Sequence, residues 1–271
     1  MEEKPRAPDD RFWKQVSSSH HPLLILDYDG TLAPFRVERM EAVPLPGVSA
    51  AIKKIMEMTA TTVAIVSGRP ISELDQLAPE LTSEVVVTGS HGWERRGPTG
   101  ALHVAERPPE IEGTLDKSRT VAKLSIERML GNPGKKRLER KAASVAVHTR
   151  GLEDALAERL LKEIKNEWGN ILAAGTEIME FNGGLEIRAK GRDKGAAVRD
   201  LLDMYPETDL PVYIGDDLTD EDAFRELSGK GVGIKVGEGE TTASYRLPDC
   251  EAVKTFLDNW NKTAKPENNR P

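Results

Sequence analysis

Short apolar runs alternate with amphipathic stretches in the first part of the chain. The runs within 23–30, 61–68 and 84–92 predict strands, and the stretches 47–58 and 69–78 predict helices. A strand that is apolar at successive positions is typical of a parallel sheet covered on both faces. The order strand, helix, strand, helix, strand therefore predicts a parallel sheet with crossover helices.

The alternation changes near residue 107. A long charged amphipathic stretch, 107–130, predicts a helix, and the segment GNPGKK that follows it is a strong stop signal. The next residues predict the alternation of an exposed-face strand, a helix closed by glycine, and further strands with a turn at Asn182-Gly183-Gly184. These elements are expected at 136–150, 151–169, 171–177 and 178–189. The inserted segment is therefore expected to follow the order helix, strand, strand, helix, strand, strand.

The alternation of apolar runs and amphipathic stretches returns after Gly191. Alternating helices and strands are expected at 193–205, 211–217, 220–227, 231–237 and 250–261. We therefore predict an α/β fold whose core is a doubly wound, Rossmann-like parallel sheet. This core takes in residues 1–106 and 191–271, and a smaller α+β cap domain, residues 107–190, is inserted into it. Residues 1–20 are expected to form a flexible or helical leader, and 263–271 a polar tail.

The composition is that of an acidic globular protein. The chain has 271 residues, a formal net charge of −7 and a pI near 5.5, so we expect no nucleic-acid partner. No window approaches the length of an apolar membrane span and the first residues show no secretory signal, so we expect no membrane contact and a cytoplasmic location. The single cysteine, Cys250, is expected to be a packed residue rather than a reactive thiol.

Acidic residues follow two of the predicted strands. They are Asp27 and Asp29 after the first strand, and Asp216, Asp217 and Asp220 after the strand at 211–217. If the strands are neighbours, these carboxylates meet at one edge of the sheet, where two charges about 4 Å apart repel by about 4 kcal/mol at an effective dielectric of about 20. A hard divalent cation, Mg²⁺ above all, relieves that repulsion. The alternative, that each aspartate only caps a helix or a turn, explains one such residue better than five.

Candidate phosphate-binding groups lie at similar strand ends. Gly30 and Thr31 follow the first aspartate pair, where a tight turn can direct backbone N–H groups and a hydroxyl at an anion. Ser67 and Gly68 follow the second strand and open the next helix; Ser67 is also a natural helix N-cap. Lys194 can supply a cation, although a surface lysine is the alternative.

The motifs DYDGT, VSGR, DKG and GDDLTDEDAF resemble, in order, the four motifs of the haloacid dehalogenase superfamily of phosphatases. Four longer segments resemble trehalose-6-phosphate phosphatases, whose cap also lies between the second and third motifs. These segments are LDYDGTLAP, GSHG, ERKAASVAVHTR and LEIRAKGRDKG. The resemblance implies a Mg²⁺-dependent hydrolysis of trehalose 6-phosphate to trehalose and phosphate, the last step of trehalose biosynthesis. Ala189 stands where that family usually has proline, and the stretch 107–136 resembles nothing that we can assign.

The resemblance also implies roles for the core residues. Asp27 is expected to be the nucleophile that forms an aspartyl-phosphate, and Asp29 the acid and then the base of the two half-reactions. Mg²⁺ is expected on the carboxylates of Asp27 and Asp216 and the backbone carbonyl of Asp29, with Asp217 and Asp220 as direct ligands or as support. The phosphoryl oxygens are expected on four residues: Thr31, Ser67, Gly68 and Lys194.

Sugar recognition is expected in the cap. The resemblance implies that Glu139, Lys141 and Glu186 contact the sugar, and His148 and Arg150 lie in the same stretch. The alternative is a solvated sheet face with cross-strand ion pairs.

Two other functions remain open from the sequence. One is a phosphatase for a related sugar phosphate, such as sucrose phosphate or glucosyl- or mannosyl-phosphoglycerate. The other is a non-catalytic sugar-phosphate-binding regulator, which the presence of the complete set of core motif residues disfavours. We expect a monomer whose ligand is a small-molecule sugar phosphate, with a transient contact to a trehalose-6-phosphate synthase.

Overall fold

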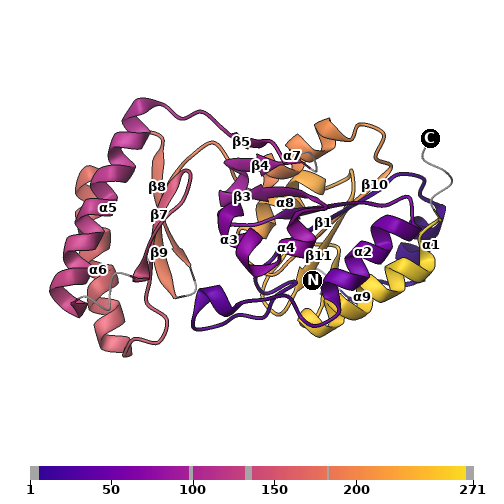
Figure 1. Ribbon diagram of the computed structural model, residues 1–271, viewed down its shortest axis with the longest axis horizontal. Coiled ribbons are helices and arrows are strands. Elements are labelled where there is room, and N and C mark those ends of the chain that lie inside the picture. Colours follow the sequence, from indigo (N-terminus) through magenta and orange to yellow (C-terminus); the bar gives the residue numbers. More distant parts are fainter. Residues whose placement is uncertain (1–5, 98–99, 132–135, 182, 267–271) are drawn as a thin grey trace. The chain divides into compact units, whose positions relative to one another are not determined.

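The computed structural model describes residues 6–97, 100–131, 136–181 and 183–266, and the chain divides into two compact units (Figure 1). One unit, here called the core, takes in the chain up to His103 and from Asp193 onward. The other unit, here called the cap, is Val104–Arg192. Each unit has its own sheet.

The core sheet, as far as the structure describes it, has eight strands in the order β12-β11-β10-β1-β2-β3-β4-β5. The pairs from β12 to β3 are parallel, and β4 is antiparallel to β3. The bounds are β1 (Pro22–Leu26), β2 (Thr62–Val66), β3 (Val86–Gly89), β4 (Glu94–Arg96), β5 (Leu102–Val104), β10 (Leu210–Gly215), β11 (Val232–Val236) and β12 (Tyr245–Leu247).

Helices cover both faces of this sheet (Figure 1). Leu24 and Leu26 pack in one apolar cluster with α1, α2, α3 and α9, while Leu23 and Ile25 pack in a second with α7 and α8. Because alternate side chains of β1 point to opposite covered faces, every position of the strand is apolar. The predicted doubly wound core is confirmed. Its helices are α1 (Asp10–Ser18), η1 (Arg39–Glu41), α2 (Val48–Met58), α3 (Ile71–Leu77), α4 (Pro79–Thr82), η2 (Ser90–Gly92), α7 (Lys194–Met204), α8 (Asp220–Leu227) and α9 (Cys250–Thr263).

The cap sheet is antiparallel, in the order β6-β7-β9-β8, and the helices α5 and α6 lie on one side of it (Figure 1). Val145, Val147, Leu185 and Ile187 are almost fully buried, which leaves the alternate positions of the same strands for polar side chains. Inside the helical layer, the buried Trp168 donates its indole N–H to the Ser118 carbonyl at 3.0 Å. The elements are α5 (Pro109–Leu130), β6 (Leu138–Arg140), β7 (Ser144–His148), α6 (Asp154–Ile171), β8 (Thr176–Phe181) and β9 (Gly184–Ala189).

One sequence-based prediction in the cap is wrong. The expected strand 171–177 is the end of α6, a loop and the first two residues of β8, because the buried helical positions Leu160, Ile164 and Trp168 continue the apolar spacing to Ile171. The stretch 136–150 forms a hairpin of β6 and β7, so the cap has the expected order of a helix, two strands, a helix and two strands. Asn182 and most of the GNPGKK segment lie outside the described residues.

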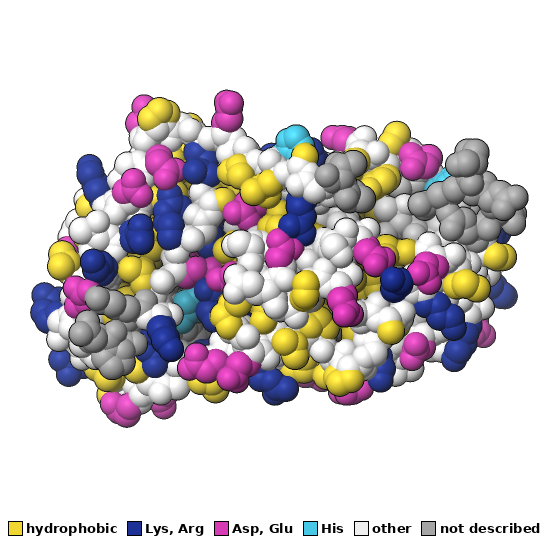
Figure 2. Space-filling view, in the orientation of Figure 1, with side chains coloured by type: hydrophobic (Ala, Val, Ile, Leu, Met, Phe, Trp, Pro, Cys, Tyr) yellow, Lys and Arg dark blue, Asp and Glu magenta, His cyan; other side chains and the backbone are white. Residues whose placement is uncertain are grey.

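Charge on the surface is mixed. Acidic and basic side chains are interspersed over the face shown in Figure 2, as the modest net charge of −7 suggests. In the part of the chain that the structure describes, no helix has the length and apolar character that crossing a membrane requires.

Candidate active site

Two neighbouring strands of the core end in aspartates at the same edge of the sheet. β1 and β10 pair in parallel with Leu26 opposite Ile214, and the Asp27 N–H extends the ladder to the Ile214 carbonyl at 2.9 Å. Carboxylate oxygens of Asp27, Asp216 and Asp220 all lie within 4.8 Å of one another. The carboxyl edge of an open α/β sheet is where such folds place their ligands.

Lys194 supplies a positive charge to this cluster. Its Nζ lies 2.8 Å from Asp27 Oδ1 and 2.6 Å from Asp220 Oδ1, and the residue is buried. Lys194 is the first residue of α7, and the N-cap Asp193 accepts a hydrogen bond from the Ala196 N–H, which fixes the start of the helix. Burial lowers the pKa of Lys194, but the carboxylates of Asp220 and Asp27 more than offset this and raise it overall.

The carboxylates of the cluster are not equivalent. Asp220 accepts from Tyr213 Oη at 2.6 Å and from the Asp217 N–H at 2.8 Å, in addition to its ion pair with Lys194. Among the described residues, by contrast, Asp216 Oδ1 is buried and has no hydrogen-bond partner. Such an orphaned buried acceptor calls for a ligand from outside the chain.

Burial and mutual repulsion both disfavour the charged forms of the carboxylates in this cluster. The pKa of Asp27 is raised well above its usual range, and burial is the largest cause. The pKa of Asp216 rises to about 7, first through burial and then through the negative charge of Asp220. Among the described residues, Lys194 is the ammonium that contacts carboxylates of this cluster, whereas Lys235 binds backbone carbonyls after β10. One carboxylate oxygen of Asp216 has no partner there, and carboxylate oxygens are hard ligands. The residues therefore fit a hard divalent cation.

Glycines allow this close approach. Gly30 has a φ of 71°, and a Cβ there would collide with the Asp216 carboxylate. A Cβ at Gly215 would collide with the Asp220 carboxylate in the same way. Cys250 donates its thiol to the Gly30 carbonyl at 3.2 Å, and burial raises its pKa to about 11, consistent with a packed rather than a reactive thiol.

The predicted phosphate-binding residues lie along the same edge of the core. Thr31 is buried, and its Oγ1 has no partner among the described residues. Ser67 follows β2 and accepts the Arg69 N–H at 3.1 Å. A Cβ at Gly68 would lie 2.7 Å from the ring of His91, whose φ of 55° is rare for a non-glycine residue. The GSHG turn therefore packs against the backbone between Ser67 and Arg69.

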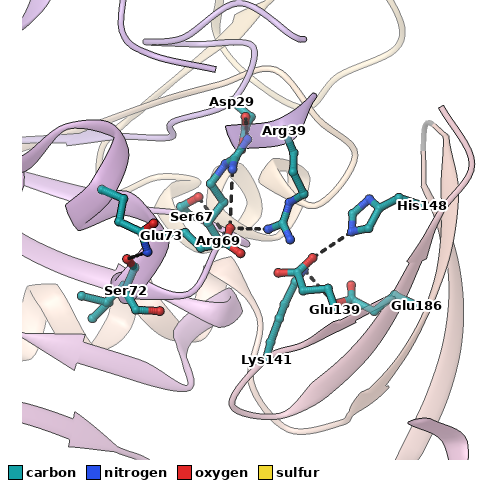
Figure 3. A network of polar contacts seen from close by, with 12 residues as sticks. Asp29, Arg39, Ser67, Arg69, Ser72, Glu73, Glu139, Lys141, His148 and Glu186 are labelled. Carbon is teal, nitrogen blue, oxygen red and sulfur yellow. Dashed lines mark hydrogen bonds and ion pairs between the residues drawn. The ribbon is translucent and has the colours of Figure 1, made fainter. Parts of the chain in front are cut away.

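Asp29 and Asp217 differ from the other predicted aspartates, because their carboxylates lie outside the cluster that Asp27, Asp216 and Asp220 form. Asp217 is exposed and accepts the Leu218 N–H at 2.7 Å. Both oxygens of Asp29 accept from Arg69, with Nε–Oδ2 at 2.6 Å and Nη2–Oδ1 at 2.7 Å (Figure 3).

Two buried cations at this edge were not singled out from the sequence. Arg69 lies within the VSGR motif after β2, but its partner Asp29 follows the neighbouring strand β1. Lys235 donates to the backbone carbonyls of Asp216 and Asp217, so it holds the loop after β10. Lys235 stands inside the apolar run of β11, where a buried ammonium needs partners. This position in the sequence was the signal that could have identified it.

The predicted sugar-contacting residues of the cap lie on the sheet face opposite the helices. Glu139 and Glu186 both pair in register with Ala146, so their side chains share that face. His148 Nε2 lies 2.8 Å from Glu139 Oε2, and Lys141 Nζ lies 2.9 Å from Glu186 Oε1 (Figure 3). Four of the five predicted residues thus form two adjacent charged pairs.

Arg150 lies in the turn after β7. Its backbone carbonyl accepts from Arg137 at 2.9 Å, and its side chain lies over Gly183, where a Cβ would collide with it. Farther along the same face, Arg188 Nε lies 2.8 Å from Glu177 Oε1. Cross-strand ion pairs are therefore present on this face, and contact of these residues with a sugar stays a prediction.

Comparison with known proteins identifies the family. The trehalose-phosphatase family model matches residues 25–251, which take in the whole cap and most of the core. The chain belongs to the trehalose-phosphatase family. The family predicted from the core and cap motifs is confirmed.

Individual relatives of the trehalose-phosphatase family agree with this. The chain is 30% identical over 251 residues to a bifunctional trehalose-6-phosphate synthase/phosphatase of Thermoproteus tenax, covering 92% of this chain and 33% of that protein. It is 33% identical over 247 residues to a probable trehalose-phosphate phosphatase of Oryza sativa, covering 87% of this chain and 64% of that protein. The chain therefore spans less than two thirds of the length of either relative.

Solved structures give the same fold. The C-terminal domain of the Candida albicans trehalose-6-phosphate phosphatase superposes with a TM-score of 0.83 at 20% identity, covering 97% of this chain and all of that one. At 20% identity this similarity shows the fold alone.

Proposed function

We propose that this chain is a Mg²⁺-dependent phosphatase that hydrolyses trehalose 6-phosphate to trehalose and phosphate through an aspartyl-phosphate on Asp27. The observation that carries the proposal is the convergence of Asp27, Asp216 and Asp220 within 4.8 Å, beside Lys194, in a member of the trehalose-phosphatase family.

Asp27 and Asp216 would hold the metal, with the backbone carbonyl of Asp29 as a further oxygen ligand. Asp220 already accepts from Lys194, Tyr213 and the Asp217 N–H, so its role would be to fix the positions of its neighbours. When bound, Mg²⁺ would offset the negative charge that the cluster and a phosphate share.

In the first half-reaction an Asp27 oxygen would form a bond to phosphorus while the bond from phosphorus to the sugar oxygen breaks. Asp29 would donate a proton to that leaving oxygen, so that trehalose leaves as the neutral alcohol.

In the second half-reaction Asp29, now a carboxylate, would take a proton from water as the water oxygen attacks phosphorus. The bond from phosphorus to Asp27 breaks, phosphate leaves, and the Asp27 carboxylate is restored.

The transferred phosphoryl group needs donors that are already in place. The Lys194 ammonium lies 2.8 Å from the nucleophilic carboxylate, and the buried Thr31 hydroxyl has no partner among the described residues. Ser67 and the Gly68 backbone N–H would complete this set from the end of β2. Donors positioned before the reaction stabilise the charge that gathers on the phosphoryl oxygens.

The cap would recognise the disaccharide. Paired charged side chains can donate to and accept from sugar hydroxyls, and the pairs Glu139–His148 and Lys141–Glu186, with Arg150 nearby, are the groups that we assign to this task. Because the Thermoproteus relative is named as a fused synthase and phosphatase, we also propose a transient contact between this chain, as a monomer, and a trehalose-6-phosphate synthase.

A substrate panel tests the proposal. Phosphate release from trehalose 6-phosphate should exceed release from glucose 6-phosphate and sucrose 6-phosphate in kcat/KM, and EDTA should abolish it. A preference for another sugar phosphate would mean that the chain is one of the related sugar-phosphate phosphatases instead. Binding of trehalose 6-phosphate without Mg²⁺-dependent release of phosphate would indicate a regulator instead of an enzyme.

A further inference from the structure

Asp29 is held by a chain of alternating charges within the core. Arg69 donates to both of its oxygens, Arg69 Nη1 lies 3.5 Å from Glu73 Oε2, and Arg39 pairs with the same Glu73 oxygen (Figure 3). A bidentate pair between arginine and a carboxylate fixes the plane of the carboxylate as well as its position.

Arg69 itself has little freedom to move. Its side chain is 8% exposed, and its guanidinium lies 5.8 Å from the centre of the Tyr28 ring. Its backbone N–H donates to Ser67 Oγ at 3.1 Å, and its carbonyl accepts the Ser90 N–H at 2.8 Å. The arginine is therefore fixed at both ends, and it can impose an orientation on Asp29.

The pairing has a chemical consequence for a residue that must serve as both acid and base. Both Asp29 oxygens accept from one guanidinium, so the plane of the carboxylate is fixed. The direction from which an Asp29 oxygen can exchange a proton with a reacting group is therefore fixed as well.

We propose that Arg69, backed by Glu73 and Arg39, is the positioning residue of Asp29: it fixes the orientation in which the carboxylate exchanges a proton in each of the two half-reactions. The inference rests on the proposed function, in which Asp29 is the acid and the base. It predicts that loss of Arg69 slows the steps that need Asp29 and spares the step that does not.

The leaving group separates these steps. Trehalose 6-phosphate needs a proton on its leaving oxygen, whereas p-nitrophenyl phosphate releases a stable phenolate and needs none. Hydrolysis of the aspartyl-phosphate needs the base with either substrate. With Arg69→Met, kcat for trehalose 6-phosphate should fall about 100-fold, within the range typical of general acid–base catalysis.

With p-nitrophenyl phosphate the same variant should release about one p-nitrophenolate per chain in a burst, at a rate within about threefold of the wild type, and then turn over slowly, since the base-dependent step limits the rate. Arg69→Lys keeps the charge but cannot bind both oxygens in one plane, so its losses should be intermediate. Adding Arg69→Met to Asp29→Asn should produce no further loss, because Arg69 acts through Asp29.

Arg96 provides the matched control. It binds Asp75, a residue of α3 like Glu73, with two contacts of 2.6 Å, but Asp75 has no assigned role in the reaction. Arg96→Met should leave both the burst and the steady-state rates unchanged. Should Arg69→Met fail to fold, Glu73→Gln, which leaves Arg69 in place, should give the same pattern with a loss of about fivefold in steady state.

Equal slowing of the burst and of the steady state in the Arg69 variants would overturn the inference, as would the same pattern in Arg96→Met. A wild-type chain that releases no phosphate from trehalose 6-phosphate would instead refute the proposed function, and the inference would fall with it. Turnover by the wild type, together with its loss in Asp29→Asn, therefore tests the function separately from the role of Arg69.

Discussion

The core edge and the cap face both concentrate charged residues, but they balance charge differently. At the core edge the Lys194 ammonium contacts Asp27 and Asp220, and a carboxylate oxygen of Asp216 has no partner among the described residues. On the cap face each predicted carboxylate has a nearby cation or imidazole. An excess of buried negative charge favours a bound cation, whereas a balanced set of charges favours hydrogen bonding with a neutral ligand.

The topology of each sheet explains this contrast. In the parallel core sheet, β1 and β10 end at the same edge, so residues that follow both strands converge whatever their charge. In the antiparallel cap sheet, side chains on one face of neighbouring strands lie close together, and opposite charges attract there, as Glu177 and Arg188 do.

The largest expected effect is that of removing the nucleophile. Asp27→Asn keeps the size of the side chain but removes its nucleophilic charge, so turnover should fall by at least about 10⁴-fold. Steady-state phosphate release, with thermal unfolding to verify the fold, measures the loss. A variant that kept even a tenth of the parent rate would show that Asp27 does not form the covalent bond.

A smaller effect is expected on the cap face. Glu186→Gln removes the charge that pairs with Lys141, so KM for trehalose 6-phosphate should rise about 10- to 100-fold, while kcat for p-nitrophenyl phosphate should change little. Lys165→Met, which removes an exposed cap pair with Glu180, serves as the control and should change neither. Equal effects on both substrates would mean that the cap face does not recognise the sugar.

The support of the cluster can be weakened without removing a charge. Tyr213→Phe deletes the hydrogen bond to Asp220 but leaves the ion pair with Lys194, so Mg²⁺ affinity should fall about 10-fold, at the low end of such indirect effects. Calorimetric titration of Mg²⁺ checks this. An unchanged affinity would mean that Asp220 needs only Lys194 to hold its position.

The smallest expected effect is a pH dependence of stability. Without metal, folding raises the pKa of Asp216 from an ordinary value of 3.8 to about 7, so the folded chain binds an extra proton between these values. Stability should therefore decline as pH rises through this window and level off above about 7. The melting temperatures of the wild type and of Asp216→Asn should be measured in EDTA across this pH window. The difference between the two proteins should change by a few degrees from one end of the window to the other. A difference that did not vary with pH would contradict the assignment.

How far the sequence predicts the molecule differs between the units. The apolar runs of β1, β2 and β10 are buried on both faces, and such runs are distinct in a sequence, so the core and its acidic strand ends were predictable. In the cap, the apolar spacing of a helix and of a half-buried strand overlap near Ile171, and tertiary packing decided between them.

The roles of Arg69 and Lys235 could not be predicted from the sequence, for a different reason. Their partners lie 40 residues away for Arg69 and 19 residues away for Lys235, and a charged residue carries no pattern that identifies a distant partner. The family motifs gave the residues that we expect to touch substrate, and the structure adds side chains that contact those residues.

The central claim is that the carboxylates of Asp27 and Asp216 share one divalent cation. Crystals grown with Mn²⁺, which scatters anomalously and takes oxygen ligands, test it most directly. A shared cation should give a single strong anomalous peak between these two carboxylates, lost in Asp216→Asn. A map in which Mn²⁺ binds elsewhere in the chain, with this position filled only by water, would contradict it.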